Sequence, residues 1–89
     1  METLAVQVVR LDLSQEIISA LREELTGGGM STGTVFIGGV SAKPELLYLV
    51  WHKTGEVPVS IALRDPRRDV TRARHAAREF LVKWHECRA

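Results

Sequence analysis

The chain has a single cysteine, no long apolar run and almost no net charge, and each shortage narrows the class of protein. Because Cys87 has no second cysteine to pair with, an internal disulfide is excluded and a reducing compartment is the default expectation. No apolar run approaches the roughly 18 residues that a membrane-spanning helix needs. The opening Met1-Glu2-Thr3-Leu4 has an acid where a secretory signal has basic residues. We therefore expect a cytoplasmic protein.

The length and composition are those of one small globular domain. The 89 residues are 45% hydrophobic and 26% charged, a balance typical of chains that fold around a core. We therefore expect a single domain over residues 1–89. The net charge is only +1, but residues 64–89 carry eight Lys or Arg against four acids, and residues 1–63 carry four against seven. The C-terminal quarter is basic and the rest is mildly acidic.

The first third of the chain predicts a strand followed by a helix. Residues 4–11 are rich in aliphatic and β-branched side chains, and Leu4, Val6 and Val8 fall on one face, which is typical of a strand. Residues 13–26 repeat apolar side chains at helical spacing after Asp12, whose oxygen would cap the helix. The glycines at 27–29 would end this helix, because glycine adopts the left-handed conformation without steric cost.

The middle of the chain predicts a short strand and a β-hairpin. Residues 34–37 form the strand, and Gly38-Gly39 would let the chain turn or bulge at its end. Residues 45–53 and 56–64 are two further β-prone runs, and Lys53-Thr54-Gly55-Glu56 between them supplies the glycine of a tight turn. The last run alternates, with Val57, Val59, Ile61 and Leu63 on one face and Pro58, Ser60, Ala62 and Arg64 on the other.

The segment from Pro66 to about Glu86 predicts a second helix. Aspartate caps free amide groups and proline suits the first helical position, so Asp65-Pro66 is a helix start. The order of elements is therefore β-α-β-β-β-α. We expect an α+β two-layer sandwich, in which both helices cover one face of a mostly antiparallel four-stranded sheet. The apolar face of this last helix consists of Val70, Ala73, Ala77, Phe80, Leu81, Trp84 and Cys87.

The last helix also carries an arginine-rich face. At 100° per residue, Arg67, Arg74, Arg78 and His85 project within about 40° of one another and no acid lies among them. Guanidinium groups match phosphate and carboxylate oxygens, so this face could bind nucleic acid or an acidic protein. It could equally be a solvated face whose arginine stems cover the sheet. The candidate anion or phosphate site comprises Arg67, Arg68, Arg72, Arg74 and Arg78.

The α-β-β-β-α order expected from Leu13 onward resembles that of the double-stranded-RNA-binding domain family. In that family, basic residues at the start of the last helix hold RNA phosphates. The resemblance implies the same role for Arg67, Arg68, Arg72 and Arg74. It is a resemblance of topology: the first strand is additional here, and the lysine pair that opens the last helix in the family is absent.

The sequence gives little support for a catalytic or a cofactor-binding motif. The glycine-rich segments 26–29 and 33–39 lack the Lys-Ser ending of a P-loop, and neither stands between a strand and a following helix. His85 and Cys87 lie about 160° apart around a helix and cannot share a metal ion. No Ser-His-Asp order with a nucleophile elbow can be traced. We expect no cofactor, no bound metal and no enzymatic activity.

The first hairpin strand is apolar on both faces. Leu46, Tyr48 and Val50 share one side, and Leu47, Leu49 and Trp51 share the other. Such a strand is either central in a sheet or covered on its outer surface by a partner, since contiguous exposed apolar patches mark interaction sites. We expect a non-enzymatic protein-binding module, a regulator, inhibitor or adaptor, whose partner is another protein or a second copy; nucleic-acid binding is the alternative. The protein-binding surface would comprise Leu47, Leu49, Trp51, Ser60 and Ala62, with Trp51 as the main energetic contact.

Overall fold

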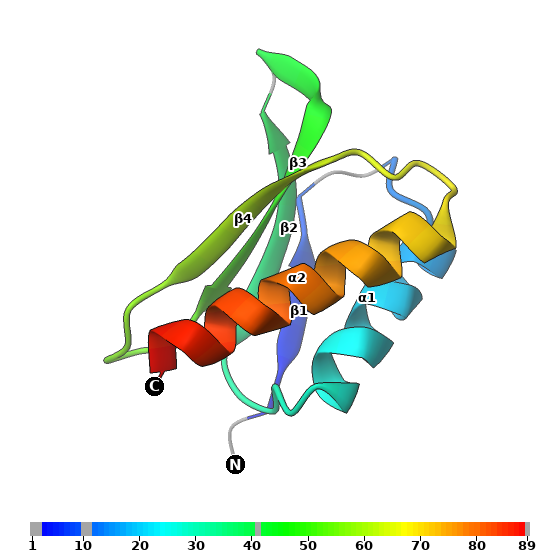
Figure 1. Ribbon diagram of the computed structural model, residues 1–89. Helices are drawn as coiled ribbons and strands as arrows, with labels where there is room; N and C mark the ends of the chain where they lie inside the picture. Colours follow the sequence, from blue (N-terminus) through cyan, green and yellow to red (C-terminus); the bar gives the residue numbers. More distant parts are fainter. Residues whose placement is uncertain (1–2, 10–11, 41, 89) are drawn as a thin grey trace.

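The computed structural model describes residues 3–9, 12–40 and 42–88. Two helices, α1 (Gln15–Gly27) and α2 (Val70–Arg88), lie on one face of a four-stranded sheet (Figure 1). In the sheet order β1-β2-β3-β4, β1 runs parallel to β2 and the other neighbours are antiparallel. The predicted α+β class and the order β-α-β-β-β-α are confirmed. The strands are β1 Ala5–Val8, β2 Thr34–Val40, β3 Lys43–His52 and β4 Val59–Arg64.

Helix α1 begins at Gln15, and its N-cap is Ser14 in place of the predicted Asp12. The Ser14 hydroxyl accepts a hydrogen bond from the backbone N–H of Ile17 at 3.3 Å, which satisfies one amide that the helix itself cannot. Leu13 before the cap and Ile18 in the first turn are both buried in the core. These are the two positions of a hydrophobic staple, so the burial of Leu13 favours Ser14 as the cap.

The glycine-rich segment that follows α1 caps the C-terminus of that helix. Gly29 has the left-handed φ of 98°, and its N–H donates to the carbonyl of Thr26 at 3.1 Å. The next N–H, of Met30, donates to the carbonyl of Leu25, also at 3.1 Å. This pair of bonds is the Schellman motif, which satisfies carbonyls at a helix C-terminus. Met30 and Leu25 are both completely buried, so the segment returns the chain to the core.

Helix α2 begins at Val70, four residues after the predicted start at Pro66. The Asp65 side chain accepts a hydrogen bond from the N–H of Arg67 at 2.8 Å, and Arg67 has the left-handed φ of 56°. A residue in that conformation cannot belong to a right-handed helix. Asp69 is the cap, since its side chain accepts from the N–H of Arg72 at 3.0 Å. An aspartate does cap the helix, but it is Asp69 and not the predicted Asp65.

The hairpin between β3 and β4 has a longer connection than the sequence indicated. The turn itself is present: Glu56 N–H donates to the carbonyl of Lys53 at 3.0 Å, and Gly55 has a φ of 85°. However, β4 begins only at Val59, so the loop covers residues 53–58. Val57, expected on the buried face of the strand, lies outside β4 and is 77% exposed. The strand predicted to end at Gly38-Gly39 instead continues through both glycines to Val40, and a register shift of the kind expected lies between Gly39 and Val40.

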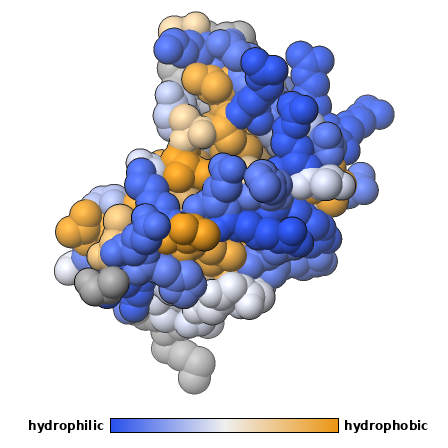
Figure 2. Space-filling view, in the orientation of Figure 1, coloured by the Kyte–Doolittle hydropathy of each residue, from blue (hydrophilic) through white to orange (hydrophobic). Residues whose placement is uncertain are grey.

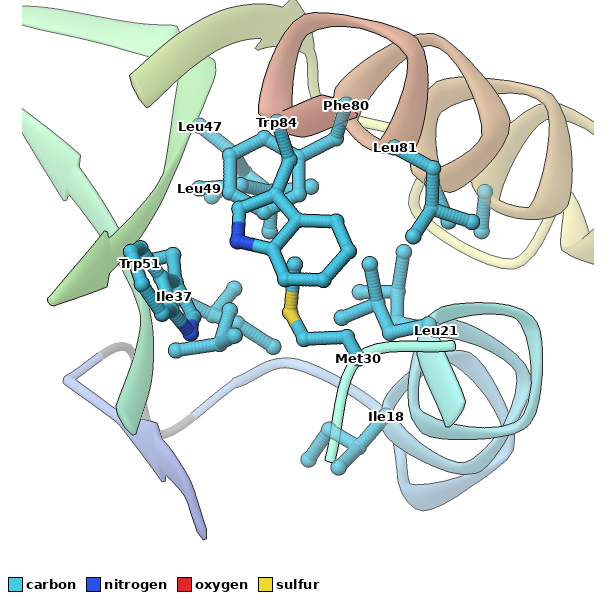
Figure 3. Close-up of a cluster of buried hydrophobic side chains, with 14 of the residues drawn as sticks. Ile18, Leu21, Met30, Ile37, Leu47, Leu49, Trp51, Phe80, Leu81 and Trp84 are labelled. Carbon is cyan, nitrogen blue, oxygen red and sulfur yellow. The ribbon is translucent and has the colours of Figure 1, made fainter. Parts of the chain in front are cut away.

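The core lies between the helices and the inner face of the sheet, and Figure 3 shows Trp84 at the centre of the cluster with Trp51 beside it. The Trp51 ring nitrogen donates to the carbonyl of Thr32 at 2.7 Å. The rings of Trp51 and Trp84 meet edge to face, 5.9 Å apart at 75°. The buried Trp84 ring nitrogen has no hydrogen-bond partner among the described residues, and in Figure 3 it lies on the side toward Trp51. An N–H directed at an aromatic face is a weak hydrogen bond.

Two contacts fasten the C-terminal half of α2 to the sheet and to the hairpin. Lys83 donates from Nζ to the carbonyl of Ser60 on β4 at 2.7 Å. Arg88 pairs with Glu56 of the hairpin loop at 3.0 Å, and its guanidinium lies 4.6 Å from the centre of the Trp84 ring. Neither described helix is long and apolar enough to cross a membrane.

Candidate protein-binding surface

The predicted placement of Leu47, Leu49 and Trp51 on the uncovered sheet face is wrong. All three side chains are at most 1% exposed and belong to the core beneath the helices (Figure 3). They cannot contact a partner in the folded protein. Trp51 in particular packs on Trp84 and is held by Thr32. Of the five predicted contact residues, Ser60 and Ala62 do lie exposed on the uncovered face.

The error has a simple geometric origin in the hairpin register. A two-residue turn at Thr54-Gly55 would place Leu49 opposite Ser60. In the structure, Leu49 is opposite Ile61, and Ser60 is opposite Val50. The longer loop shifts the pairing by one residue, and such a slip moves a whole set of side chains to the other face. The sequence carried a usable signal: Ile61 belongs to the more apolar side of β4, and the pairing joins it to the side of β3 that the helices cover.

The uncovered face of the sheet presents an apolar centre. Directly paired residues share a face, so Tyr48 lies beside Ala62, and Val50 lies beside Phe36 and Ser60. Apart from the exposed Ala62, the side chains at the centre are half-buried although no described helix covers them, because their neighbours on the sheet shield them. A rim of polar residues surrounds them. The apolar centre consists of Phe36, Leu46, Tyr48, Val50 and Ala62, and the rim includes Gln7, Thr34, His52, Ser60 and Arg64.

Val9 extends this apolar surface toward the β1 edge. Its side chain is 69% exposed, and its Cβ would lie 3.4 Å from a Cβ placed on Gly38. Gly38 therefore leaves the space that Val9 occupies on the face, next to Tyr48 in the register. The turn or bulge was predicted at Gly38-Gly39, and the register shift lies between Gly39 and Val40; no surface role was predicted for Val9. Val9 and Gly38 lie far apart in the sequence, so nothing in it indicates strongly that they are neighbours.

The helix side of the molecule shows a different distribution (Figure 2). Apolar surface remains visible between α2 and the upper strands, and hydrophilic side chains gather at the end where β4 leads into α2. On the inner face of β4, Ile61 and Leu63 are partly buried and pack against the core. Val82 is the one large apolar side chain of α2 described as exposed, at 58%. The apolar surface on this side is thus the margin of the core.

The predicted arginine-rich face of α2 is divided by contacts with α1. Arg74 pairs with Glu23 at 2.8 Å and with Glu24 at 3.4 Å. Arg78 forms two hydrogen bonds with Glu24, at 3.1 and 3.2 Å. These are two of the five arginines assigned to an anion site, and both are engaged by carboxylates of the same chain. The face has no acid along its own helix, but packing of α1 against α2 supplies two.

The charges of this contact reinforce one another. The hydrogen bond from Arg78, followed by its charge and the contacts from Arg74, holds the pKa of Glu24 below its ordinary value, although burial opposes the shift. The hydrogen bond to Glu23, followed by the contacts with Glu24, raises the pKa of Arg74, and the hydrogen bond to Glu24 raises the pKa of Arg78. His85, at the end of the predicted face, has its Nε2 3.2 Å from the carbonyl of Gly28. This part of α2 therefore fastens the helices together.

The remaining arginines line an open cleft of about 890 Å³ where the segment before α1, the β4–α2 connection and β3 meet. Arg67, Arg68 and Arg72, three of the predicted anion-site residues, line it together with Arg64, which the prediction omitted. Arg72 pairs loosely with Asp69, at 3.9 Å. The cleft also contains carboxylates, so its charge is mixed: Asp12, Glu45, Asp65 and Asp69 complete the charged lining.

No family model, no curated protein and no solved structure matches this chain. Within the described residues, no three His, Cys, Asp or Glu side chains gather as a metal-binding group. The candidate site consists of an uncovered sheet face with an apolar centre, which meets a cleft of mixed charge at Arg64.

Proposed function

We propose that this protein is a non-enzymatic, cytoplasmic binding module that docks another protein on its uncovered sheet face and acts as a regulator, inhibitor or adaptor. The observation that supports this most directly is the apolar centre of that face, formed by Phe36, Tyr48 and Val50. Contiguous apolar surface with a polar rim is the arrangement found in protein interfaces. Tyrosine at its centre suits such a role, because it contributes a large contact area at a small cost in conformational entropy.

The contacts of the arginine-rich helix weigh against the alternative of nucleic-acid binding. Arg74 and Arg78 would have to leave Glu23 and Glu24 to contact phosphates. The three predicted arginines that remain lie in a cleft that also contains four carboxylates. A net charge of +1 adds little long-range attraction for a polyanion. Nucleic acid is therefore an outcome to be tested and not the main proposal.

A site-specific photo-cross-linker identifies the partner of the sheet face. A benzophenone-bearing phenylalanine replaces Tyr48 at the centre of the face, and in a matched variant it replaces the exposed Val82 on α2. Both proteins are produced in the native cell, irradiated and analysed by mass spectrometry with and without nuclease. We expect a defined protein adduct from position 48 that position 82 does not give.

Variants that keep the fold separate this surface from its competitors. Ala62 is exposed, so Ala62→Arg adds bulk to the open face without disturbing the core and should abolish the adduct from position 48; Val82→Arg should leave it intact. A nucleic-acid adduct, or an adduct that survives Ala62→Arg, would show the proposed surface to be wrong. An adduct between two copies of the chain would replace the foreign partner by a homodimer.

A further inference from the structure

Arg64 joins the uncovered sheet face to the arginine-lined cleft. Its partner across the sheet is Leu46, so its side chain belongs to the same face as Tyr48 and Val50. It also lines the cleft together with Arg67 and Arg68. A protein docked on the open face would therefore extend directly over the cleft.

The guanidinium groups of Arg64, Arg67 and Arg68 have no hydrogen bond or ion pair within the described part of the chain. Every other arginine of the β4–α2 region has an acidic partner: Arg72 has Asp69, and Arg74 and Arg78 have the glutamates of α1. Three neighbouring arginines without a partner among the described residues, in a region where the other arginines are paired, present donors without acceptors. Their natural ligands are anionic oxygens.

The backbone at Arg67 points in the same direction. Its φ of 56° lies in the left-handed region, where glycine or asparagine is usual and a long side chain is uncommon. Two hydrogen bonds fix this turn: the Asp65 carboxylate accepts from the N–H of Arg67, and Asp69 N–H donates to the carbonyl of Pro66. Strained backbone of this kind is found most often at functional sites. The position keeps an arginine where the backbone alone would favour glycine.

We propose that the cleft binds a carboxylate-bearing segment of a partner protein, with Arg64, Arg67 and Arg68 as the donors. Arg64 belongs both to the open sheet face and to the cleft, and this continuity favours a segment of a docked protein over a nucleic-acid strand. Such a segment can place a carboxylate at the guanidinium groups. The identification of this segment as part of the docked partner rests on the function proposed above.

Binding of hexaglutamate to the intact protein tests the cleft separately from the sheet face. The peptide is titrated to millimolar concentration, and backbone and arginine Nε resonances are followed by NMR. We expect saturable shifts at the cleft residues, and a weakening of at least about fivefold for Arg67→Gln. The matched control is Arg22→Gln, on the exposed side of α1, which should leave the affinity unchanged. Arg67→Gly removes the guanidinium in a conformation that glycine accepts, so loss of binding with an unchanged melting temperature would also support the proposal.

Three results would overturn it: no shift at the cleft, equal losses for Arg67→Gln and Arg22→Gln, or a hexathymidylate that binds the cleft as tightly as hexaglutamate does. The two proposals fail separately. If position 48 gives a protein adduct but hexaglutamate leaves the cleft unmoved, the cleft inference is wrong and the docking surface stands. If hexaglutamate binds the cleft but position 48 gives no adduct, the cleft stands and the docking surface is wrong.

Discussion

The two faces of the sheet differ strongly in burial, although the side chains of β3 are apolar on both of its sides. On this central strand, Leu47, Leu49 and Trp51 are fully buried, whereas Leu46, Tyr48 and Val50 remain partly exposed, yet both sets are apolar. The neighbouring strands make the difference. On the inner face, β3 lies between Val35 and Ile37 of β2 and Val59 and Ile61 of β4; on the outer face it lies between Phe36, Gly38, Ser60 and Ala62. In a strand that is apolar on both sides, the residues of the neighbouring strands determine which side is buried.

Truncation of an aromatic side chain on each face should give the largest contrast. We expect Trp51→Ala to lower the free energy of unfolding by about 3–5 kcal/mol, because it leaves a cavity beside Trp84 and removes the hydrogen bond to Thr32. Tyr48→Ala should cost about 1 kcal/mol, since the half-buried ring loses only cross-strand contacts. Urea unfolding of both variants measures the difference. Equal losses would mean that the two faces are not as unlike as their burial indicates.

An effect of intermediate size on stability should separate two glycines that have the same backbone conformation but different surroundings. Gly33 and Gly55 have φ values of 87° and 85°. A Cβ on Gly33 would lie 2.6 Å from the Trp51 ring nitrogen and 2.9 Å from the carbonyl of His52. A Cβ on Gly55 would have no neighbouring atom within 4 Å. Gly55→Ala should therefore cost about 1 kcal/mol for the left-handed conformation alone, and Gly33→Ala about 3 kcal/mol in total. Thermal unfolding of the two variants checks this, and similar losses would argue against close packing at Gly33.

The smallest effect should come from the ion pairs at the border of the helix layer. Because the contacts with Arg78 and Arg74 hold the folded-state pKa of Glu24 below its ordinary value of 4.5, they stabilise the fold above that pH. This contribution is lost as the pH falls from 4.5 through the folded pKa, when the carboxylate is protonated. Glu24→Gln should therefore flatten the acid limb of the stability curve, most clearly at low salt.

The matched control for this pH effect is Glu79→Gln. Glu79 lies on the exposed side of α2, where its only described partner is His75 at 3.3 Å. Urea midpoints between pH 3 and 7 measure the limb for both variants. If Glu79→Gln changed the acid limb as much as Glu24→Gln does, the α1–α2 contact would have no special part in acid stability.

The order of elements could be predicted from the sequence because local signals mark it. Helical spacing identifies α1 and α2, the glycines after Thr26 end α1, and alternation identifies β4. These signals act within a few residues and need no knowledge of the rest of the fold. Where two local signals competed, however, sequence alone did not separate them. Asp12 and Ser14 both suit a helix cap, as do Asp65 and Asp69, and in each pair the second is the cap that forms.

The candidate site depended on relations between distant segments, and there prediction was weaker. The length of the β3–β4 loop determines which side of β3 lies beside Ser60. The predicted register differs from the observed one by one residue, and for this reason Trp51 was expected on the surface although it lies in the core. Likewise, the charge of the arginine-rich face could not be judged from α2 alone, because Glu23 and Glu24 approach it from another helix. Ser60, Ala62, Arg67, Arg68 and Arg72 remain accessible as expected; the sheet-face centre and Arg64 emerged only from the pairing of the strands.

The hydrogen bond from Lys83 to Ser60 has a consequence for how copies of this protein meet in a crowded solution. β4 is an edge strand, and an edge strand can add a foreign strand and start aggregation through its free backbone groups. Any strand that joined β4 near its beginning would first have to displace an ammonium group from the Ser60 carbonyl, 2.7 Å away. A charged lysine at an edge is a common protection of this kind. Growth of the sheet from copy to copy is therefore hindered at this edge, and the broad face beside it is not affected by the contact.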